Sequence, residues 1–283
     1  MCPVPGPHTL TGSTAPSIAR VYDFLAGGCD WHDADRQLAE RITDPREGYP
    51  GLRRLIADNR GFQNRAATWA LAGGIRQVLD IGCGLPSPAS VTATARAYDP
   101  PARVACVDID PLVVCHAGAA AAGDPGVTVL AGDVREPEAI LADPALLEAI
   151  DLREPVCAVL GAILHFMDAG QAADVTARLT ARLAPGSCAV ISTVWYAEPE
   201  MAARITRCYT AAKLRNHDRA AVASFFTAAG LELVSERVMN VHSWPMAASG
   251  VTRDAMMLGG VGIKRLAARS RASAPRRSSL PGS

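Results

Sequence analysis

The sequence predicts an α/β fold in which a mostly parallel sheet is covered by helices on both faces. From residue 76 onward, short β-branched runs alternate with longer alanine-rich runs, a pattern typical of parallel strands joined by crossover helices. Of the 283 residues, 49% are hydrophobic and 20% are charged, so the chain can bury a large aliphatic core. We therefore expect one ordered globular domain with room for an additional cap.

The alternating runs give the expected elements in order. Strands are expected at 76–81, 103–108, 127–131, 155–161 and 188–194. Helices are expected at 87–98, 111–122, 136–149, 168–184, 198–214 and 217–229. The last two apolar runs, 231–239 and 254–265, have no crossover helix between them. They are therefore predicted to pair antiparallel at one edge of the sheet.

The first 75 residues hold no convincing strand, and helices are expected there at 16–26, 33–43 and 51–73. Three helices ahead of the sheet suggest a cap beside the site. The expected domains are a helical cap over 1–75, the main domain over 76–265 and a basic, disordered tail over 266–283.

The charge distribution argues against nucleic acid as a partner. The chain has 28 basic and 28 acidic residues, but six basic residues and no acid lie between positions 264 and 283. The body is therefore mildly acidic, whereas nucleic-acid binding usually requires a clustered basic face. We expect a small-molecule partner, while the sequence does not indicate an oligomeric state.

Membrane and secretory signals are not evident. The N-terminus lacks a basic region followed by an apolar one, and no apolar stretch approaches the length of a membrane span. The eight cysteines show no C-x-x-C spacing, so reduced thiols and a cytoplasmic location are expected. No set of His, Cys or carboxylates has the spacing of metal ligands, and no metal is expected.

A glycine-containing turn follows the first strand in the tract VLDIGCGLP at 78–86. Glycine allows a sharp turn and close approach of a ligand, and the amino end of the next helix offers free N–H groups. A dinucleotide fingerprint would carry a third glycine where Ser87 stands. The turn thus indicates a small polar ligand and disfavours a nicotinamide-dependent oxidoreductase.

Acidic residues end the next two strands. Asp108 lies 26 residues after Gly82, where a carboxylate in this kind of fold can reach both ribose hydroxyls. Asp133 follows the third strand and could accept a hydrogen bond from an adenine amino group. Each aspartate alone is usually a cap or turn residue. Together with the glycine turn, they indicate a nucleoside-containing ligand.

These motifs resemble those of class I S-adenosylmethionine (SAM)-dependent methyltransferases, in the succession LDIGCG, VDID and GDVR. A more specific resemblance, to the actinobacterial S-adenosyl methyltransferase family, long listed as a domain of unknown function, rests on five tracts. They are SIARVYDFLAGGCDWHDADR (17–36), NRGFQNRA (59–66), LDIGCGLPS (79–87), VDIDP (107–111) and ILHFM (163–167). Cys83 departs from the threonine that is common in the family.

The resemblance implies a Rossmann-like class I methyltransferase fold, with a seven-stranded sheet, an antiparallel edge hairpin and an N-terminal helical cap, and SAM as the cofactor. The implied cofactor-binding residues are Asp80, Gly82, Gly84, Asp108, Ile109, Asp133, Val134 and Gly161. The first three would shape the methionine end, the next two would hold the ribose and line the adenine, and the following two would contact the adenine edge. Gly161 and His165 would border the sulfonium and the substrate.

Methyl transfer from a sulfonium is an in-line displacement in which the protein mainly aligns the reacting atoms. A base is needed only if the acceptor loses a proton, and the candidates are Tyr22, Asp23, His32 and His165. Each has an alternative: Tyr22 could pack in a core, Asp23 could be a solvated helix residue, His32 a cap residue and His165 a hydrogen-bonded structural residue. Substrate could be oriented by Asn59, Arg60 and Asn64.

Three aromatic residues, Trp195, Tyr196 and Trp244, could line an apolar pocket or simply anchor loops. The sequence thus suggests C-, N- or O-methylation of a small aromatic or peptidic secondary metabolite, indoles included, in natural product biosynthesis. The alternative is a regulatory protein that binds SAM and S-adenosylhomocysteine (SAH) without turnover.

Overall fold

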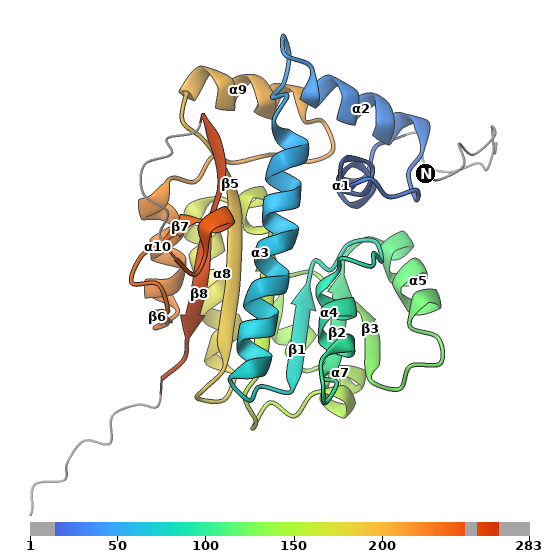
Figure 1. Ribbon diagram of the computed structural model, residues 1–283, viewed down its shortest axis with the longest axis vertical. Coiled ribbons are helices and arrows are strands. Elements are labelled where there is room, and N and C mark those ends of the chain that lie inside the picture. The colour runs from blue at the N-terminus through green and yellow to red at the C-terminus, as the bar shows by residue number, and fades with distance from the viewer. Residues whose placement is uncertain (1–14, 247–253, 266–283) are drawn as a thin grey trace, which may run out of the picture.

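The computed structural model describes residues 15–246 and 254–265, and the predicted tail lies outside them. An eight-stranded sheet has the order β3-β2-β1-β4-β5-β8-β6, with β7 also paired to β8 (Figure 1). The strands are β1 (Gln77–Ile81), β2 (Arg103–Asp108), β3 (Val127–Ala131), β4 (Cys157–Gly161), β5 (Cys188–Tyr196), β6 (Glu232–Leu233), β7 (Met239–Asn240) and β8 (Ala255–Ile263). Strands β1 to β5 are parallel, and β8 runs antiparallel to β5, β6 and β7.

Helices occupy the connections, as predicted. Ahead of the sheet are α1 (Ile18–Ala26), α2 (Asp33–Thr43) and α3 (Leu52–Ala72). Within it are α4 (Val91–Ala97), α5 (Pro111–Ala120), α6 (Pro137–Leu141), α7 (Pro144–Ala149), the 3-10 helix η1 (Leu164–Phe166), α8 (Ala169–Ala181), α9 (Pro199–Cys208), α10 (Arg219–Ala228) and the 3-10 helix η2 (Val241–Ser243). The α/β class and the antiparallel edge are thereby confirmed.

The sheet has eight strands, where seven were expected. The run 231–239 was expected to be one strand, but it forms β6 and β7 with a turn between them. Leu233 pairs with Gly262 and Met239 with Gly259. The chain therefore advances six residues from β6 to β7 while it advances only three along β8. The extra length loops out at Glu236, whose φ of 61° is left-handed.

Three of the expected helices differ clearly in extent from the observed ones, two of them because of a local cap. The helix expected from residue 87 begins at Val91, because the Ser90 side chain caps it. The helix expected over 136–149 divides, because Asp143 caps a second helix with proline in its first turn. The helix expected over 198–214 ends at Cys208, which leaves residues 209–218 as a loop.

Alternate residues of each central strand serve the two faces of the sheet. Val78, Val104 and Val159 belong to a core under α3 and α4. Leu79, Val107 and Leu160 belong to a second core under α6, α7, α8 and α10. Helix α3 thus contacts β4, β5 and β8 directly and lies along the sheet, as Figure 1 shows.

Helices α1 and α2 lie beyond the carboxyl ends of the parallel strands and have a small core of their own (Figure 1). The buried pair Arg20 and Asp35 joins them, with Arg20 Nε 2.6 Å from Asp35 Oδ2. Asp35 also accepts hydrogen bonds from the backbone N–H groups of Ser17 and His32, both at 2.8 Å. One buried carboxylate thus fixes the start of α1 against the start of α2.

The expectation that all cysteines are reduced needs one correction. Six of them are free thiols: Cys83, Cys106, Cys115, Cys157, Cys188 and Cys208. Cys29 takes part in a disulfide. None of the helices that the structure describes is long and apolar enough to cross a membrane.

Because α3 packs in the core, shortening one of its buried side chains should lower the free energy of unfolding strongly. Leu71 is fully buried in the core under α3, whereas Leu147 on α7 is 50% exposed. We expect Leu71→Ala to lower the free energy of unfolding by about 2–5 kcal/mol, and Leu147→Ala to change it by less than about 0.5 kcal/mol. Urea titrations of both variants measure this, and equal effects would contradict the assignment of α3 to the core.

Candidate functional site

A cavity of about 560 Å³ opens at the carboxyl ends of the parallel strands, within the usual size range of ligand sites. Its floor is formed by the turns that follow β1, β2, β3 and β4. The first residues of α1 cover it, and α3 and the loop after α9 close one side. Segments from seven parts of the chain therefore meet around one space.

The glycine turn after β1 presents its backbone to this cavity. Gly82 and Gly84 have φ values of 70° and 67°, which side-chain-bearing residues rarely adopt. A Cβ on Gly82 would collide with Ile163, while one on Gly84 would project into open space. The turn thus packs closely on one side and leaves room for a ligand on the other.

Asp108 is held rigidly at the end of β2. Its Oδ2 accepts a hydrogen bond from the Gly84 N–H at 3.0 Å, and its Oδ1 accepts one from the Asp110 N–H at 3.0 Å. Burial raises the pKa of Asp108, and these backbone hydrogen bonds oppose the rise. Ile109 beside it is 59% exposed, so a carboxylate and an apolar side chain stand next to each other on the cavity wall.

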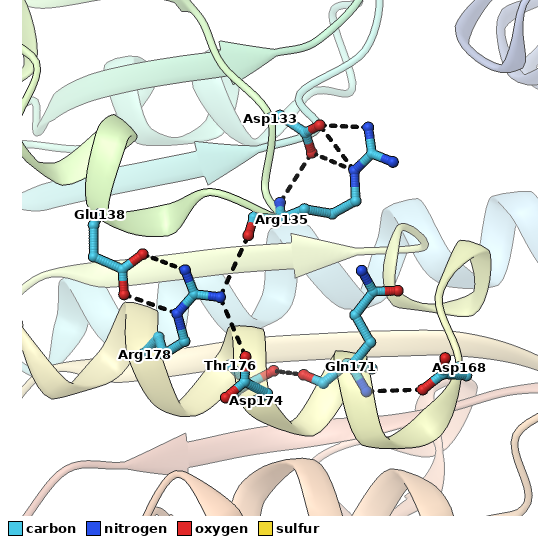
Figure 2. Close-up of polar contacts among 9 residues, drawn as sticks. Asp133, Arg135, Glu138, Asp168, Gln171, Asp174, Thr176 and Arg178 are labelled. Carbon is cyan, nitrogen blue, oxygen red and sulfur yellow. Dashed lines mark hydrogen bonds and ion pairs between the residues drawn. The ribbon is translucent and has the colours of Figure 1, made fainter.

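Asp133, after β3, is paired with a neighbour two residues away (Figure 2). Arg135 Nε lies 2.9 Å and 2.8 Å from its two carboxylate oxygens, and this guanidinium holds the pKa of Asp133 below its usual range. Arg178 of α8 donates to Glu138 at 2.8 Å and to the Arg135 carbonyl at 3.5 Å. The segment that lines this end of the cavity is thus tied to α8.

Asp80 lies beneath the glycine turn and does not line the cavity. It is 6% exposed, and burial raises its pKa to about 7, partly opposed by Arg60. Its carboxylate is therefore close to the protonation equilibrium at neutral pH. A cationic group brought near it would favour the ionised form.

A chain of buried hydrogen bonds joins α1 to β5. Asn59 Nδ2 donates to the Tyr22 hydroxyl at 3.0 Å, and Ser192 Oγ donates to Asn59 Oδ1 at 2.6 Å. The Ala162 N–H donates to Ser192 Oγ at 3.1 Å, which supports the left-handed φ of 59° at Ala162. The position of Tyr22 is thereby coupled to the turn after β4.

Arg60 lies over Tyr22, with Cζ 5.1 Å from the ring centroid. Both side chains line the cavity. Arg60 Nε is buried and has no hydrogen-bond partner among the described residues. Since a buried donor without a partner is costly, this guanidinium is suited to an anionic ligand group.

Comparison with known proteins bears on this cavity. A family model described as S-adenosyl methyltransferase matches residues 7–265. The chain belongs to the S-adenosyl methyltransferase family. It is accordingly a SAM-dependent methyltransferase by family, and SAM is its cofactor.

Two solved structures from actinobacteria are similar to this family member over nearly its whole length. A Thermobifida fusca YX protein, solved as a candidate methyltransferase, is 32% identical, with a TM-score of 0.79 over 92% of this chain and 99% of that chain. A DUF574 family protein from Streptomyces avermitilis MA-4680 is 32% identical, with a TM-score of 0.77 over 88% of this chain and 98% of that chain.

More distant similarity extends to the fold alone. An O-methyltransferase family protein from Burkholderia thailandensis is 15% identical, with a TM-score of 0.52 over 90% of this chain and 66% of that chain. A search of curated proteins finds no significant match.

The residues of the cavity fit the family's cofactor. Seven of the eight cofactor-binding residues implied by the sequence line it: Gly82, Gly84, Asp108, Ile109, Asp133, Val134 and Gly161. The eighth, Asp80, lies directly behind. A Cβ on Gly161 would meet the end of the Gln63 side chain from α3, so glycine leaves room for that amide at the turn after β4.

The four candidate catalytic residues of this methyltransferase are spread more widely. Tyr22 lines the cavity, whereas Asp23, His32 and His165 do not. Asp23 is buried and accepts a hydrogen bond from the Asp30 N–H at 3.0 Å. His32 is exposed and forms a capping box with Asp35 at the start of α2. Their positions favour roles in the loop between α1 and α2.

His165 is buried behind the cavity wall. Its Nδ1 accepts a hydrogen bond from the Val194 N–H at 3.3 Å, and burial, with a smaller effect of His217, lowers its pKa to about 3. The ring is therefore neutral at physiological pH. Phe166 packs against it, with ring centroids 4.5 Å apart.

Several cavity residues were not singled out from the sequence. Those with side chains of functional interest are Ser17, Gln63, Asp110, Arg135, Phe166 and Lys213. Gln63 and Phe166 lie in tracts that carry the family resemblance, while Lys213 was expected inside a helix and gave no signal. Asn64, a candidate for orienting substrate, instead donates to the Ala89 carbonyl at 3.0 Å.

The three aromatic residues suggested as pocket walls do not line the cavity. Trp244 is buried against Phe62 and Trp69, and Tyr196 against Tyr49. Trp195 packs on the core under α8 and α10. The aromatic side chains that face the cavity are Tyr22 and Phe166, among the residues described.

The raised pKa of Asp80 predicts a pH dependence of stability without cofactor. Because its folded pKa of about 7 exceeds the usual 3.8, its contribution is fully present below about pH 4 and is lost as the pH rises through about 7. We expect Asp80→Asn to make stability less dependent on pH across this interval, by about 4 kcal/mol at most. Urea titrations at several pH values measure the slope, with the exposed Asp174→Asn as control. An unchanged slope in Asp80→Asn would contradict the raised pKa.

Proposed function

We propose that SAM binds along the carboxyl ends of the strands, with its adenine near β3, its ribose at β2 and its methionine part over β1 and β4. The observation that carries this proposal is the placement of the glycine turn, Asp108 and Asp133 on one cavity, in the order β1, β2, β3. Asp108 would accept from the ribose hydroxyls, and Asp133 and Val134 would contact the adenine edge. Ile109 supplies an apolar face for the base.

The methionine part of SAM carries a carboxylate and an ammonium group, and a charged residue in or behind the cavity wall suits each of them. Arg60 has a buried Nε without a partner, which suits the carboxylate. Asp80 lies behind the glycine turn as a buried carboxylate, and its negative charge would favour an ammonium group on the other side of the turn. Both ends of the zwitterion would then be compensated.

When bound, SAM supplies an electrophilic methyl group on a positively charged sulfur. The chain's own residues position the acceptor against that methyl group and exclude water. Phe166 forms an apolar wall, because its ring stacks on Tyr209 with centroids 6.0 Å apart and an interplanar angle of 23°. The first residues of α1 complete the enclosure.

For the acceptor, we propose a small aromatic or peptidic metabolite, methylated on oxygen, nitrogen or carbon in natural product biosynthesis. The mixed aromatic and polar lining from Tyr22, Phe166 and Gln63 supports a compact ligand of this kind. The acidic body of the chain supports a small molecule over nucleic acid. We expect product formation from SAM with such acceptors, rather than binding alone.

The ribose assignment predicts a specific loss of cofactor affinity. Removing the charge at Asp108 should weaken SAM and SAH binding by about 10–100-fold, as expected for charge-assisted hydrogen bonds. Asp108→Asn keeps the shape of the side chain, and Asp174→Asn on the surface of α8 is the matched control. Calorimetric titration with SAM, SAH and NAD measures the effect. Binding of NAD, or unchanged SAH affinity in Asp108→Asn, would contradict the assignment.

If Arg60 binds the methionine carboxylate, its loss should weaken only those ligands that carry this carboxylate. SAH and 5′-methylthioadenosine share the adenosine part, but only SAH has the amino-acid carboxylate. We expect Arg60→Met to weaken SAH binding by about 10-fold or more while leaving 5′-methylthioadenosine nearly unchanged. The exposed Arg153→Met is the control in the same titrations. Equal losses for the two ligands would indicate a structural role for Arg60.

A further inference from the structure

The order of the strands in the sheet shows which residues lie at each end of the cavity. Along the sheet the order is β3, β2, β1, β4, so the turn after β4 lies farthest from Asp133. Lys213, which lines the cavity, belongs to this far end, because two residues later the Arg215 N–H donates to the His165 carbonyl at 2.8 Å. The far end, where the acceptor would lie under the proposed function, therefore carries Tyr22, Arg60, Gln63, Phe166 and Lys213.

The carboxylates that line the cavity belong to the opposite end and are all engaged. Asp108 accepts from two backbone N–H groups. Asp110 caps α5 through the Leu112 N–H at 2.9 Å and accepts from Ser17 Oγ at 2.7 Å. Asp133 is paired with Arg135. None of the three lies beside the far end, where a base for the acceptor would be needed.

Tyr22 is a hydrogen-bond donor in this arrangement. Its hydroxyl accepts a hydrogen bond from Asn59 Nδ2 at 3.0 Å, and the Arg60 guanidinium lies over its ring, with Cζ 5.1 Å from the centroid. A phenol that accepts one hydrogen bond still has a proton to donate, and a ligand in the cavity can accept it. Burial raises the pKa of Tyr22, with Arg60 and Asn59 opposing the rise, so the phenol stays protonated at neutral pH.

The remaining titratable groups at or behind this wall do not supply a base either. Cys83 lines the cavity as a thiol, and the contact with Cys106 together with burial raises its pKa. His165 already uses Nδ1 to accept from Val194. Neither Asp23 nor Asp80 lines the cavity: Asp23 accepts a hydrogen bond from the Asp30 N–H, and the buried Asp80 lies beneath the glycine turn. Among the described residues, the far end thus offers cations and donors to the acceptor.

We infer that the methyl acceptor binds as an anion, a phenolate, enolate or carboxylate already deprotonated in solvent, with Lys213 and the Tyr22 hydroxyl holding its charge. This inference rests on the proposed function and specifies its substrate class. The acceptor oxygen forms a bond to the methyl carbon while the carbon–sulfur bond breaks, and the electron pair of that bond passes to sulfur. No proton moves in the step, so no protein base is required.

The charge balance at the far end favours such an acceptor. Under the proposed function the methionine carboxylate offsets Arg60, and the buried Asp80 offsets the methionine ammonium group. Asp23 is also within electrostatic range of Arg60, but it does not line the cavity. Lys213 and the sulfonium, which is close to the transferred methyl group, remain as positive charges toward the acceptor. An anion is therefore attracted and an amine in its ammonium form is repelled.

The test uses the full chain saturated with SAH, and para-nitrophenol as the probe. Its phenol and phenolate forms absorb at different wavelengths, so absorbance across a pH series gives the pKa of the bound probe. We expect that pKa to be lowered by about one unit or more relative to free solution. The neutral ether para-nitroanisole should bind at least about 10-fold more weakly than the phenolate.

Lys213 is exposed, so its substitution is compatible with folding. Lys213→Met should return the pKa of the bound probe toward its value in solution, while Lys213→Arg, the matched control, should keep the lowered value. Equal affinity for the phenolate and the ether, an unshifted or raised pKa, or failure of the SAH-loaded protein to bind the phenolate would overturn the inference. Failure of SAH itself to bind, measured first by calorimetry, would instead overturn the proposed function.

Discussion

Helix α3 packs its apolar side on the sheet, and this one constraint positions much of the polar chemistry. Phe62 is fully buried in the core, which turns Asn59, Arg60 and Gln63 of the same helix toward the strand ends. Glycine at position 161 leaves room for the Gln63 amide at the turn after β4. The packing of α3 on the sheet thus determines where a cation, an amide and the hydrogen-bond partner of Tyr22 are placed.

The cap depends on a second buried interaction. Asp35 receives hydrogen bonds from Ser17, Arg20 and His32, so the start of α1 cannot leave α2 without exposing or stranding a buried charge. Ser17 is also tied to Asp110 at the start of α5. Because residues 16–19 cover the cavity, the enclosure of a ligand is coupled to the integrity of this pair.

The fold and the cofactor end of the cavity could be predicted because their signals are local. Strand periodicity, the glycine turn and the aspartates at strand ends are each visible within a few residues of sequence. Lys213 and Ser17 could not be found in this way. They reach the cavity because α9 ends at Cys208 and because Asp35 anchors α1, and both facts arise from contacts between distant segments. For the same reason, Trp244 could not be distinguished from a pocket residue before its packing on Phe62 was known.

The same reasoning explains why, within the described part of the chain, none of several candidate bases faces the end of the cavity proposed for methyl transfer. A carboxylate or imidazole acts as a base only if its lone pairs face the substrate and its surroundings tolerate the protonated form. In this fold those lone pairs serve structure: Asp23 holds the loop after α1, and His165 accepts from β5. Under the proposed function, Lys213 and the Tyr22 hydroxyl remain for the acceptor. Such groups stabilise a negative charge formed elsewhere, so acceptor acidity, rather than proton abstraction by the protein, becomes the property that selects the substrate.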